Sequence, residues 1–290
     1  MIGAELEGAL RFALGSSVKR ASRLSGGDIN DAFELELASG RRVFLKTNAK
    51  AAPSMFPAEA RGLAWLRAAG ELRVPEVLAV SSGRVGEPGF LVLELLSSAR
   101  RCADFDERLG RGLARLHRFG APRFGLDHDN FIGSLPQRNQ SHASWAEFYW
   151  NERLEPQLVR AISAGLASAR LSDGFARLAK RLPSLVGAEE PPARLHGDLW
   201  GGNLHVDDAG VPCLIDPAAY GGHREMDLAM MRLFGGFSEH VFRAYAEEWP
   251  LSAGHAERIT LYQLYPLMVH VNLFGGGYVD SVERGLARYV

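Results

Sequence analysis

The sequence predicts an α+β fold of two lobes, with a small sheet-containing lobe at residues 1–96 and a larger, mainly helical lobe at residues 97–290. Three observations support this division. Five short runs of strand-forming residues alternate with turns before residue 97. From Ser97 onward, apolar residues recur at the three- and four-residue spacing of amphipathic helices. A glycine-rich loop bracketed by short strands interrupts this helical part near residue 200.

Composition describes an ordinary globular protein. Hydrophobic residues make up 47% of the 290 residues, charged residues 23%, and the formal net charge is −1. This balance gives no electrostatic reason to expect nucleic acid or an anionic membrane as a partner. No apolar run approaches the roughly 20 residues that cross a bilayer, and the first fourteen residues lack the basic start of a secretory signal. We therefore expect a cytoplasmic protein, a monomer or weak dimer, without a nucleic-acid or membrane partner.

The small lobe is expected to begin with a helix and to continue as an antiparallel sheet. Ile2, Leu6, Leu10 and Leu14 share one face of a helix that Gly15 ends. Apolar and β-branched runs between turn residues then predict the strands. We expect these strands at residues 18–24, 32–37, 42–46, 77–81 and 90–95.

Two features of the first three strands indicate phosphate binding. The turn Ser25-Gly26-Gly27-Asp28-Ile29-Asn30 can present backbone N–H groups to phosphate oxygens, although Gly-Gly turns also join hairpins that bind nothing. The third strand ends on Lys46, the place where kinases hold the lysine that pairs with nucleotide phosphates. The order of glycine turn, strand, turn and lysine-bearing strand therefore favours nucleotide binding by Gly26, Gly27 and Lys46.

A helix expected at residues 57–69 carries Glu59 in its first turn. Two interpretations of Glu59 stay open. Its carboxylate is favourable to the helix dipole at that end, or it reaches across to Lys46 and positions the ammonium group for the phosphates. After the fifth strand, Glu94, Leu95 and Leu96 are expected to form the connector whose backbone meets the adenine. There Glu94 would contribute its carbonyl and amide groups rather than its charge.

The helical lobe contains a long loop and several helices. The loop is expected at residues 120–144, where Gly and Pro interrupt the pattern, and loops of this length are often functional. Helices are expected at residues 105–119, 144–158, 172–182, 225–234, 239–247 and 256–273. In the fourth of these, Asp227 stands beside Leu228, Met230 and Met231. We expect so isolated a carboxylate to bond the backbone of the glycine-rich loop rather than a substrate.

The glycine-rich loop, Leu-His-Gly-Asp-Leu-Trp-Gly-Gly-Asn at residues 195–203, holds the candidate catalytic group. Asp198 and Asn203 lie five positions apart, as in the kinase catalytic loop, and Asp216 follows thirteen residues later. A hairpin between strands expected at residues 204–206 and 211–215 would carry Asn203 and Asp216 to the same end. Phosphoryl transfer needs a carboxylate to orient or deprotonate a hydroxyl, and oxygen ligands for Mg²⁺ on the nucleotide. The alternative is that each Asp only caps a turn.

These motifs resemble those of the fructosamine kinase (ketosamine-3-kinase) family, which shares the protein-kinase-like fold with aminoglycoside and choline kinases. The resemblance extends over about residues 16–278. Its most specific elements are Trp200 and the Phe-Gly-Gly-Phe segment at residues 234–237, because the wider group of kinases shares the set of Asp198, Asn203 and Asp216.

The resemblance implies ATP-dependent phosphorylation of the 3-hydroxyl of a ketosamine, the adduct of a sugar on an amine. The product is unstable and sheds the sugar, so such enzymes are regarded as deglycating repair kinases. By position, Asp198 would be the base, and Asn203 and Asp216 would be the Mg²⁺ ligands. Trp200, two residues past the base, would form a wall against the sugar, with packing beneath the loop as its alternative.

On the nucleotide side, the resemblance makes Lys46 the phosphate clamp, Glu59 the residue that orients it, and Glu94, Leu95 and Leu96 the adenine connector. Asp216 is followed by Pro217-Ala218 rather than Phe-Gly, so we expect no activation loop of the protein-kinase type. Two rival functions remain open at this point. One is phosphorylation of an aminoglycoside or a choline-type amino-alcohol; the other is nucleotide binding without turnover, as in a pseudokinase.

Overall fold

The computed structural model describes residues 2–24 and 30–290, and these form two compact units. The first unit joins the chain up to Phe105 with the segment Leu204–Pro217, and the second contains Asp106–Asn203 and Ala218–Val290. Both units are thus interrupted in sequence. The single domain boundary expected after residue 96 stays a prediction.

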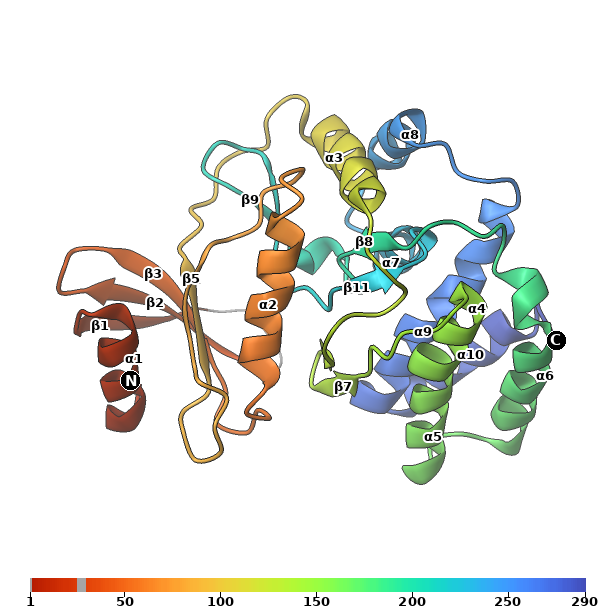
Figure 1. Ribbon diagram of the computed structural model, residues 1–290, viewed down its shortest axis with the longest axis horizontal. Helices are drawn as coiled ribbons and strands as arrows, with labels where there is room; N and C mark the ends of the chain where they lie inside the picture. Colours follow the sequence, from red (N-terminus) through yellow and green to blue (C-terminus); the bar gives the residue numbers. More distant parts are fainter. Residues whose placement is uncertain (1, 25–29) are drawn as a thin grey trace. The chain divides into compact units, whose positions relative to one another are not determined.

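The first unit contains the five-stranded antiparallel sheet that the sequence predicts, with strand order β1-β2-β3-β5-β4 (Figure 1). Its helices are α1 (Ala4–Leu14) and α2 (Met55–Arg67). Its sheet strands are β1 (Val18–Leu24), β2 (Asp31–Leu37), β3 (Arg42–Thr47), β4 (Val77–Val80) and β5 (Phe90–Glu94). A separate hairpin of β9 (Leu204–Val206) and β10 (Pro212–Leu214) belongs to the same unit.

Side-chain alternation along the strands sets the two faces of this sheet. Phe33, Leu35 and Leu37 are buried at every second position of β2, and they pack with Leu10 of α1. Lys46 follows Leu45 in β3 and therefore points to the opposite face, where α2 lies (Figure 1). The sheet consequently carries an apolar core against α1 and the candidate phosphate lysine against α2.

The second unit is mainly helical, as predicted, and its described residues also form short hairpins, a π-helix and 3-10 turns. Its α-helices are α3 (Phe105–Phe119), α4 (Trp145–Phe148), α5 (Glu155–Ser163), α6 (Ala169–Leu185), α7 (Glu225–Phe234), α8 (Glu239–Glu248), α9 (His255–Phe274) and α10 (Val279–Leu286). Its other elements are β6 (Asn130–Ile132), β7 (Leu135–Gln137), β8 (Ala193–Leu195), β11 (Tyr220–Gly222), the π-helix η1 (Tyr149–Leu154) and the 3-10 turns η2 (Gly201–Asn203) and η3 (Gly276–Tyr278).

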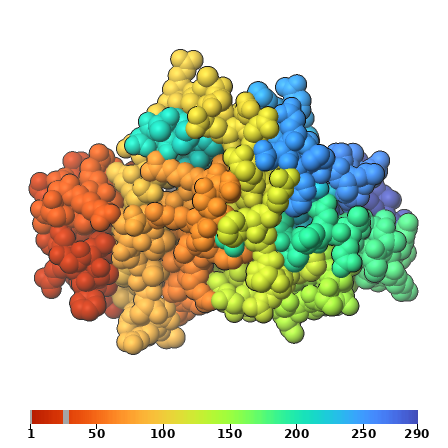
Figure 2. Space-filling view, turned by 45° about the horizontal axis from the view of Figure 1, so that its top comes forward, coloured from red at the N-terminus to blue at the C-terminus, as the bar shows by residue number. Residues whose placement is uncertain are grey.

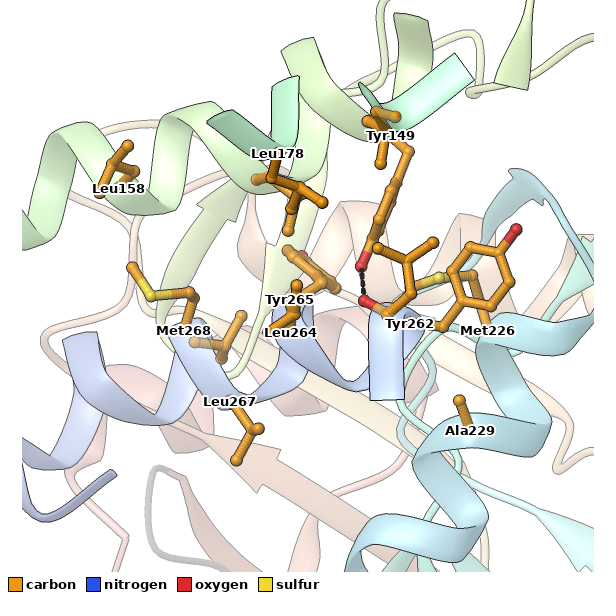
Figure 3. Close-up of a cluster of buried hydrophobic side chains, with 14 of the residues drawn as sticks. Tyr149, Leu158, Leu178, Met226, Ala229, Tyr262, Leu264, Tyr265, Leu267 and Met268 are labelled. Carbon is orange, nitrogen blue, oxygen red and sulfur yellow. Dashed lines mark hydrogen bonds between the residues drawn. The ribbon is translucent and has the colours of Figure 1, made fainter. Parts of the chain in front are cut away.

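The core of this unit forms around α9. Tyr262, Tyr265 and Met268 of α9 are buried in one cluster with Tyr149 and Leu178 (Figure 3). The Tyr149 hydroxyl donates to the Leu261 carbonyl oxygen at 2.7 Å, so the polar end of a fully buried ring is satisfied. The neighbouring helices of this unit therefore pack against α9.

Several elements differ from the sequence-based expectation, and the helix expected at residues 144–158 is divided into α4, η1 and α5. The region expected as a loop at residues 120–144 contains the β6–β7 hairpin, β11 pairs with β8, and α10 follows the last predicted helix. The short strands have three residues each, too few for a two-residue periodicity to be recognised.

Within residues 2–24 and 30–290, no helix combines the length and the apolar character needed to span a bilayer.

Candidate active site

A buried lysine between two carboxylates forms the centre of the site in the first unit. Lys46 Nζ lies 2.8 Å from Glu59 Oε1 and 2.9 Å from Asp216 Oδ1, and the lysine is only 7% exposed. Burial lowers the pKa of the Lys46 ammonium, but the charges of Asp216 and Glu59 outweigh burial and raise the pKa above its ordinary value. Lys46 is therefore a cation at every physiological pH.

The helix that carries Glu59, α2, begins at Met55, two residues earlier than expected. The carboxylate consequently lies in the second turn, and the first turn of α2 holds no acidic residue. The helix-dipole interpretation of Glu59 is thus wrong, and the predicted contact with Lys46 is confirmed at 2.8 Å. Burial raises the pKa of the Glu59 carboxyl group, while Lys46 acts in the opposite direction.

Asp216 has a backbone conformation that sets it apart. Its φ of 54° is the one left-handed value at a non-glycine position in the described part of the chain. Aspartate tolerates this region better than most residues, and such conformations collect at functional sites. Asp216 follows β10 by two residues, and β10 pairs Leu214 with Leu204 of β9. The hairpin register therefore returns the chain to the end where Asn203 precedes β9, as the sequence predicts.

The expected adenine connector begins where β5 ends. The Glu94 amide donates to the Glu76 carbonyl oxygen at 2.9 Å, so this amide cannot serve a nucleotide without breaking that bond. The Glu94 carboxylate accepts hydrogen bonds from the Glu76 amide at 3.0 Å and from Arg73 at 3.1 Å, which gives its charge a structural use. Leu95 and Leu96 follow, half-buried. Gly26 and Gly27 lie outside the described residues.

In the second unit, Asn203 holds the candidate base. The Asn203 amide nitrogen donates to the Asp198 carbonyl oxygen at 2.7 Å and to Asp198 Oδ2 at 3.0 Å. The 3-10 turn η2 (Gly201–Asn203) produces this approach by turning the loop back on itself. The five-residue spacing therefore closes a small ring in which Asn203 orients the Asp198 carboxylate.

Asp227 fixes the start of the same loop from beneath. Its Oδ2 accepts from the His196 amide at 2.8 Å, and its Oδ1 accepts from the Gly197 amide at 2.9 Å. The sequence-based prediction that Asp227 bonds the loop backbone is thus confirmed. Burial raises the pKa of Asp227, but the hydrogen bonds from His117 and the loop outweigh burial and lower the pKa below its ordinary value of 3.8.

We predict that Asp227→Asn destabilises the fold and reduces kcat. An amide offers one acceptor atom where the carboxylate accepts from two amides and from His117, 3.1 Å away, so the loss should be about 3 kcal/mol for this fully buried group. Chemical denaturation measures the loss, with Asp280→Asn on the exposed face of α10 as the control. Equal stability of the two variants would contradict the proposal that Asp227 holds the loop backbone in place.

The same variant makes a prediction about pH. Because the folded-state pKa of Asp227 is lowered, its stabilisation is present above the ordinary value of 3.8 and is lost as the pH falls through the folded-state value. The stability gap between the protein and Asp227→Asn should therefore be full at pH 7 and close below about pH 4. A gap of constant size across this range would exclude the ionised carboxylate as its source.

Glycines let a second segment approach the glycine-rich loop at residues 195–203. A Cβ on Gly201 would lie 3.2 Å from the Gly236 Cα, and a Cβ on Gly236, whose φ is 93°, would lie 2.8 Å from the Gly201 Cα. The Phe-Gly-Gly-Phe segment at residues 234–237 thus packs directly on the loop. Trp200, 42% exposed, places its ring over Gly202, where a Cβ would come within 2.3 Å. Leu199, the residue before Trp200, is fully buried.

Two groups of buried polar residues escaped the sequence analysis. His117 links Asp227 to Tyr245, with Nδ1 2.9 Å from the tyrosine hydroxyl. Its position four residues after the buried Leu113 could have placed it on the core face of α3. In the second group, Asn130 and Gln137 donate to the carbonyl oxygens of Ala219 and Ala218, and Tyr265 donates to Gln137. No sequence signal identifies that group, because its members meet only after β6 and β7 form.

Two sets of features define a kinase-like phosphotransferase. The first is the sheet of the first unit with its buried lysine, and the second is the helical unit with its Asp–Asn loop. A crystal structure of an aminoglycoside phosphotransferase in complex with ADP and hygromycin B has the same fold, with a TM-score of 0.62 at 17% identity over 97% of this chain and 99% of that one. The model of the fructosamine kinase family matches residues 8–290. The chain belongs to that family.

Individual relatives agree with this membership. The chain is 36% identical to a probable ketoamine kinase of Lactiplantibacillus plantarum, over 94% of this chain and 95% of the relative. It is 35% identical to the chloroplastic protein-ribulosamine 3-kinase of Arabidopsis thaliana, over 95% of this chain and 84% of that protein. A crystal structure from Thermobifida fusca, assigned as a fructosamine-3-kinase, superposes with a TM-score of 0.88 at 35% identity and 99% coverage of both chains.

Proposed function

We propose that this protein transfers the γ-phosphoryl group of ATP to the 3-hydroxyl of a ketosamine, and that its product releases the sugar from the amine. The observation that carries the proposal is the buried Lys46, held between Glu59 and Asp216. A fixed cation beside a carboxylate that can take a metal ion is what nucleotide phosphates require. Family membership supports the choice of a ketosamine as the acceptor.

On the nucleotide side, the Lys46 ammonium binds phosphate oxygens while Glu59 keeps it in place. Mg²⁺ is a hard cation that takes oxygen ligands, and the donor atoms of Asp216 and Asn203 fit it. Asp216 offers a carboxylate. The amide nitrogen of Asn203 bonds Asp198, so its Oδ1 is the atom with metal-binding chemistry. Bound Mg²⁺ would neutralise charge on the phosphates. The carbonyl group of Glu94 and the backbone at Leu95 and Leu96, together with Gly26 and Gly27, complete the proposed nucleotide site.

On the acceptor side, Asp198 takes the proton of the attacking hydroxyl. The acceptor oxygen forms the new P–O bond as the bond from the γ-phosphorus to the bridging oxygen of ADP breaks, and the proton passes to the Asp198 carboxylate. Asn203 orients that carboxylate through the 3.0 Å bond to Oδ2, and Asp227 holds the loop backbone. Positioned acid–base groups of this kind contribute about 10²- to 10⁴-fold to the rate.

We predict that Trp200→Ala raises the KM for a ketosamine about tenfold and leaves the KM for ATP unchanged. The exposed indole offers an apolar face to the C–H surface of a sugar, and losing such a contact costs a factor of ten for each ~1.4 kcal/mol. Steady-state kinetics with each substrate varied in turn provides the measurement. Phe12→Ala, at a 92% exposed position of α1, is the matched control. A rise in the KM for ATP alone would remove Trp200 from the acceptor wall.

The proposed acceptor is tested by comparing kcat/KM for ketosamines, aminoglycosides and choline at saturating Mg·ATP. Ketosamines should be the best substrates, because a site built around substrate hydroxyls rejects ligands that leave its polar groups unpaired. An aminoglycoside or choline with a higher kcat/KM than every ketosamine would contradict the proposed acceptor but not the kinase chemistry.

The use of Mg²⁺ and a cytoplasmic location remain part of the proposal. One relative is chloroplastic, so the compartment varies among these enzymes.

A further inference from the structure

Arg73, between α2 and β4, contacts two segments of the first unit that carry parts of the proposed nucleotide site, the end of β5 and the β9–β10 hairpin. Its Nη2 lies 3.1 Å from Glu94 Oε2, at the start of the adenine connector. Its Nη1 lies 2.5 Å from Asp207 Oδ2 and 3.0 Å from Asp208 Oδ1, both in the turn of the β9–β10 hairpin. One guanidinium therefore bridges carboxylates of two segments that are far apart in sequence, Glu94 on one side and the neighbouring Asp207 and Asp208 on the other.

The hairpin end of this bridge is built to be rigid. Asp207, 1% exposed, uses Oδ1 to accept from the amides of Ala209 at 3.0 Å and Val211 at 2.9 Å, which closes the turn. Burial raises the pKa of Asp207, but these amides and Arg73 outweigh burial and lower it below its ordinary value. The carboxylate that Arg73 binds is thus ionised and fixed to the hairpin backbone.

The backbone of Arg73 holds the other end of the hairpin. The Arg73 carbonyl oxygen accepts from the Leu214 amide at 2.8 Å, and Arg73 forms a parallel bridge with Cys213 of β10. Asp216 follows two residues later. Figures 1 and 2 show the hairpin (teal) against the orange-to-yellow segments of the same unit. Arg73 thus fixes β10 through its backbone and the turn through its side chain, and both contacts determine where Asp216 lies.

The connector end is equally defined. Glu94 uses Oε2 for Arg73 and Oε1 for the Glu76 amide, while its own amide donates to the Glu76 carbonyl oxygen. Its backbone lies opposite Val43 in the sheet. Both carboxylate oxygens of Glu94 are engaged in these bonds. A movement of Glu94 therefore also displaces the Arg73 guanidinium.

We propose that Arg73 is a positioning residue that couples the adenine connector to Asp216, so that occupation of the one favours metal–phosphate binding at the other. This inference rests on the proposed function for its ligand, Mg·ATP. A lysine cannot replace Arg73, because an ammonium is a point charge that cannot span three carboxylates as a planar guanidinium does. A single fixed bridge of this kind makes the two ends of the nucleotide site one cooperative element.

The test measures how strongly Mg²⁺ tightens ATP binding, as the ratio of the Kd for ATP in EDTA to the Kd for Mg·ATP. Calorimetry on the full chain is applied to Arg73→Lys, which keeps a cation beside Asp207, and to Glu94→Gln, which cuts only the connector arm. Both should lower the ratio about fivefold or more. The double variant should lose no more than the larger single loss, because both changes break one bridge. Arg42→Lys is the control, because Arg42 is an exposed residue of β3 that pairs with Glu34 of β2.

The ratio separates coupling from stability. A purely structural role would lower Tm and leave the ratio within twofold of the unmodified protein, and that result overturns the proposal. If Arg73→Lys fails to fold, Glu94→Gln decides alone, since direct effects on adenine cancel in the ratio. Absence of Mg²⁺-dependent ATP binding in the unmodified protein would overturn both proposals. Strong Mg·ATP binding without ketosamine phosphorylation would refute the acceptor and leave the Arg73 coupling to be judged by the ratio.

Discussion

Replacing Asp198 by Asn is expected to reduce kcat by about 10²- to 10⁴-fold while the protein folds and binds Mg·ATP normally. The amide keeps the shape of the side chain and can still accept the hydrogen bond that Asn203 donates at 3.0 Å. It cannot accept the proton of the attacking hydroxyl. Single-turnover measurements of phosphoryl transfer, together with calorimetric titration of Mg·ATP, separate the chemical step from binding.

The matched control for this change is Asp173→Asn, at an exposed position of α6. It makes the same substitution without touching the loop and should leave kcat unaltered. Near-normal turnover of a well-folded Asp198→Asn variant would remove Asp198 from the role of base. The loop would then serve only to position the acceptor.

Replacing Asp216 by Asn should weaken Mg²⁺-dependent ATP binding more than any other single change in the first unit, by about a hundredfold, or ~2.7 kcal/mol. A carboxylate offers Mg²⁺ a full charge, and an amide offers only a dipole. Asparagine is the informative replacement because the backbone at this position has a φ of 54°. Asparagine tolerates that left-handed conformation, whereas alanine would add strain of its own.

Asn203→Ala provides the comparison for Asp216. Losing a neutral ligand should weaken Mg·ATP binding less than losing a charged one, although kcat should also fall because Asp198 is no longer oriented. Calorimetric titrations of Mg·ATP into both variants measure the difference. Equal or reversed losses would contradict the assignment of Asp216 as the principal metal ligand.

Local sequence patterns were sufficient to predict the five-stranded sheet. Alternation in β2 and the turn before β3 place Lys46 on the face opposite the apolar core. The spacing of Asp198 and Asn203 encodes a contact within one tight loop, which depends on few other residues. These features could be predicted because each is determined by neighbours close in sequence.

The contacts that fix the site were harder to predict because they join segments far apart in sequence. Arg73 meets Asp207 across 134 positions, and His117 meets Asp227 across 110. Each residue taken alone has the pattern of an ordinary surface or helix residue. Glu59 shows the same limit at shorter range: the two-residue difference in the start of α2 removes it from the first turn, and its contact with Lys46 joins α2 to β3.

The most direct test of ketosamine 3-kinase activity is to determine where the phosphate goes. The protein, ATP and Mg²⁺ are incubated with a fructosamine labelled with ¹³C at C3, and the product is followed by ³¹P and ¹³C NMR. We expect coupling of phosphorus to C3, followed by loss of the sugar and recovery of the free amine, with no product from Asp198→Asn. Phosphate on another hydroxyl, or ATP hydrolysis without a phosphorylated sugar, would contradict the proposed activity.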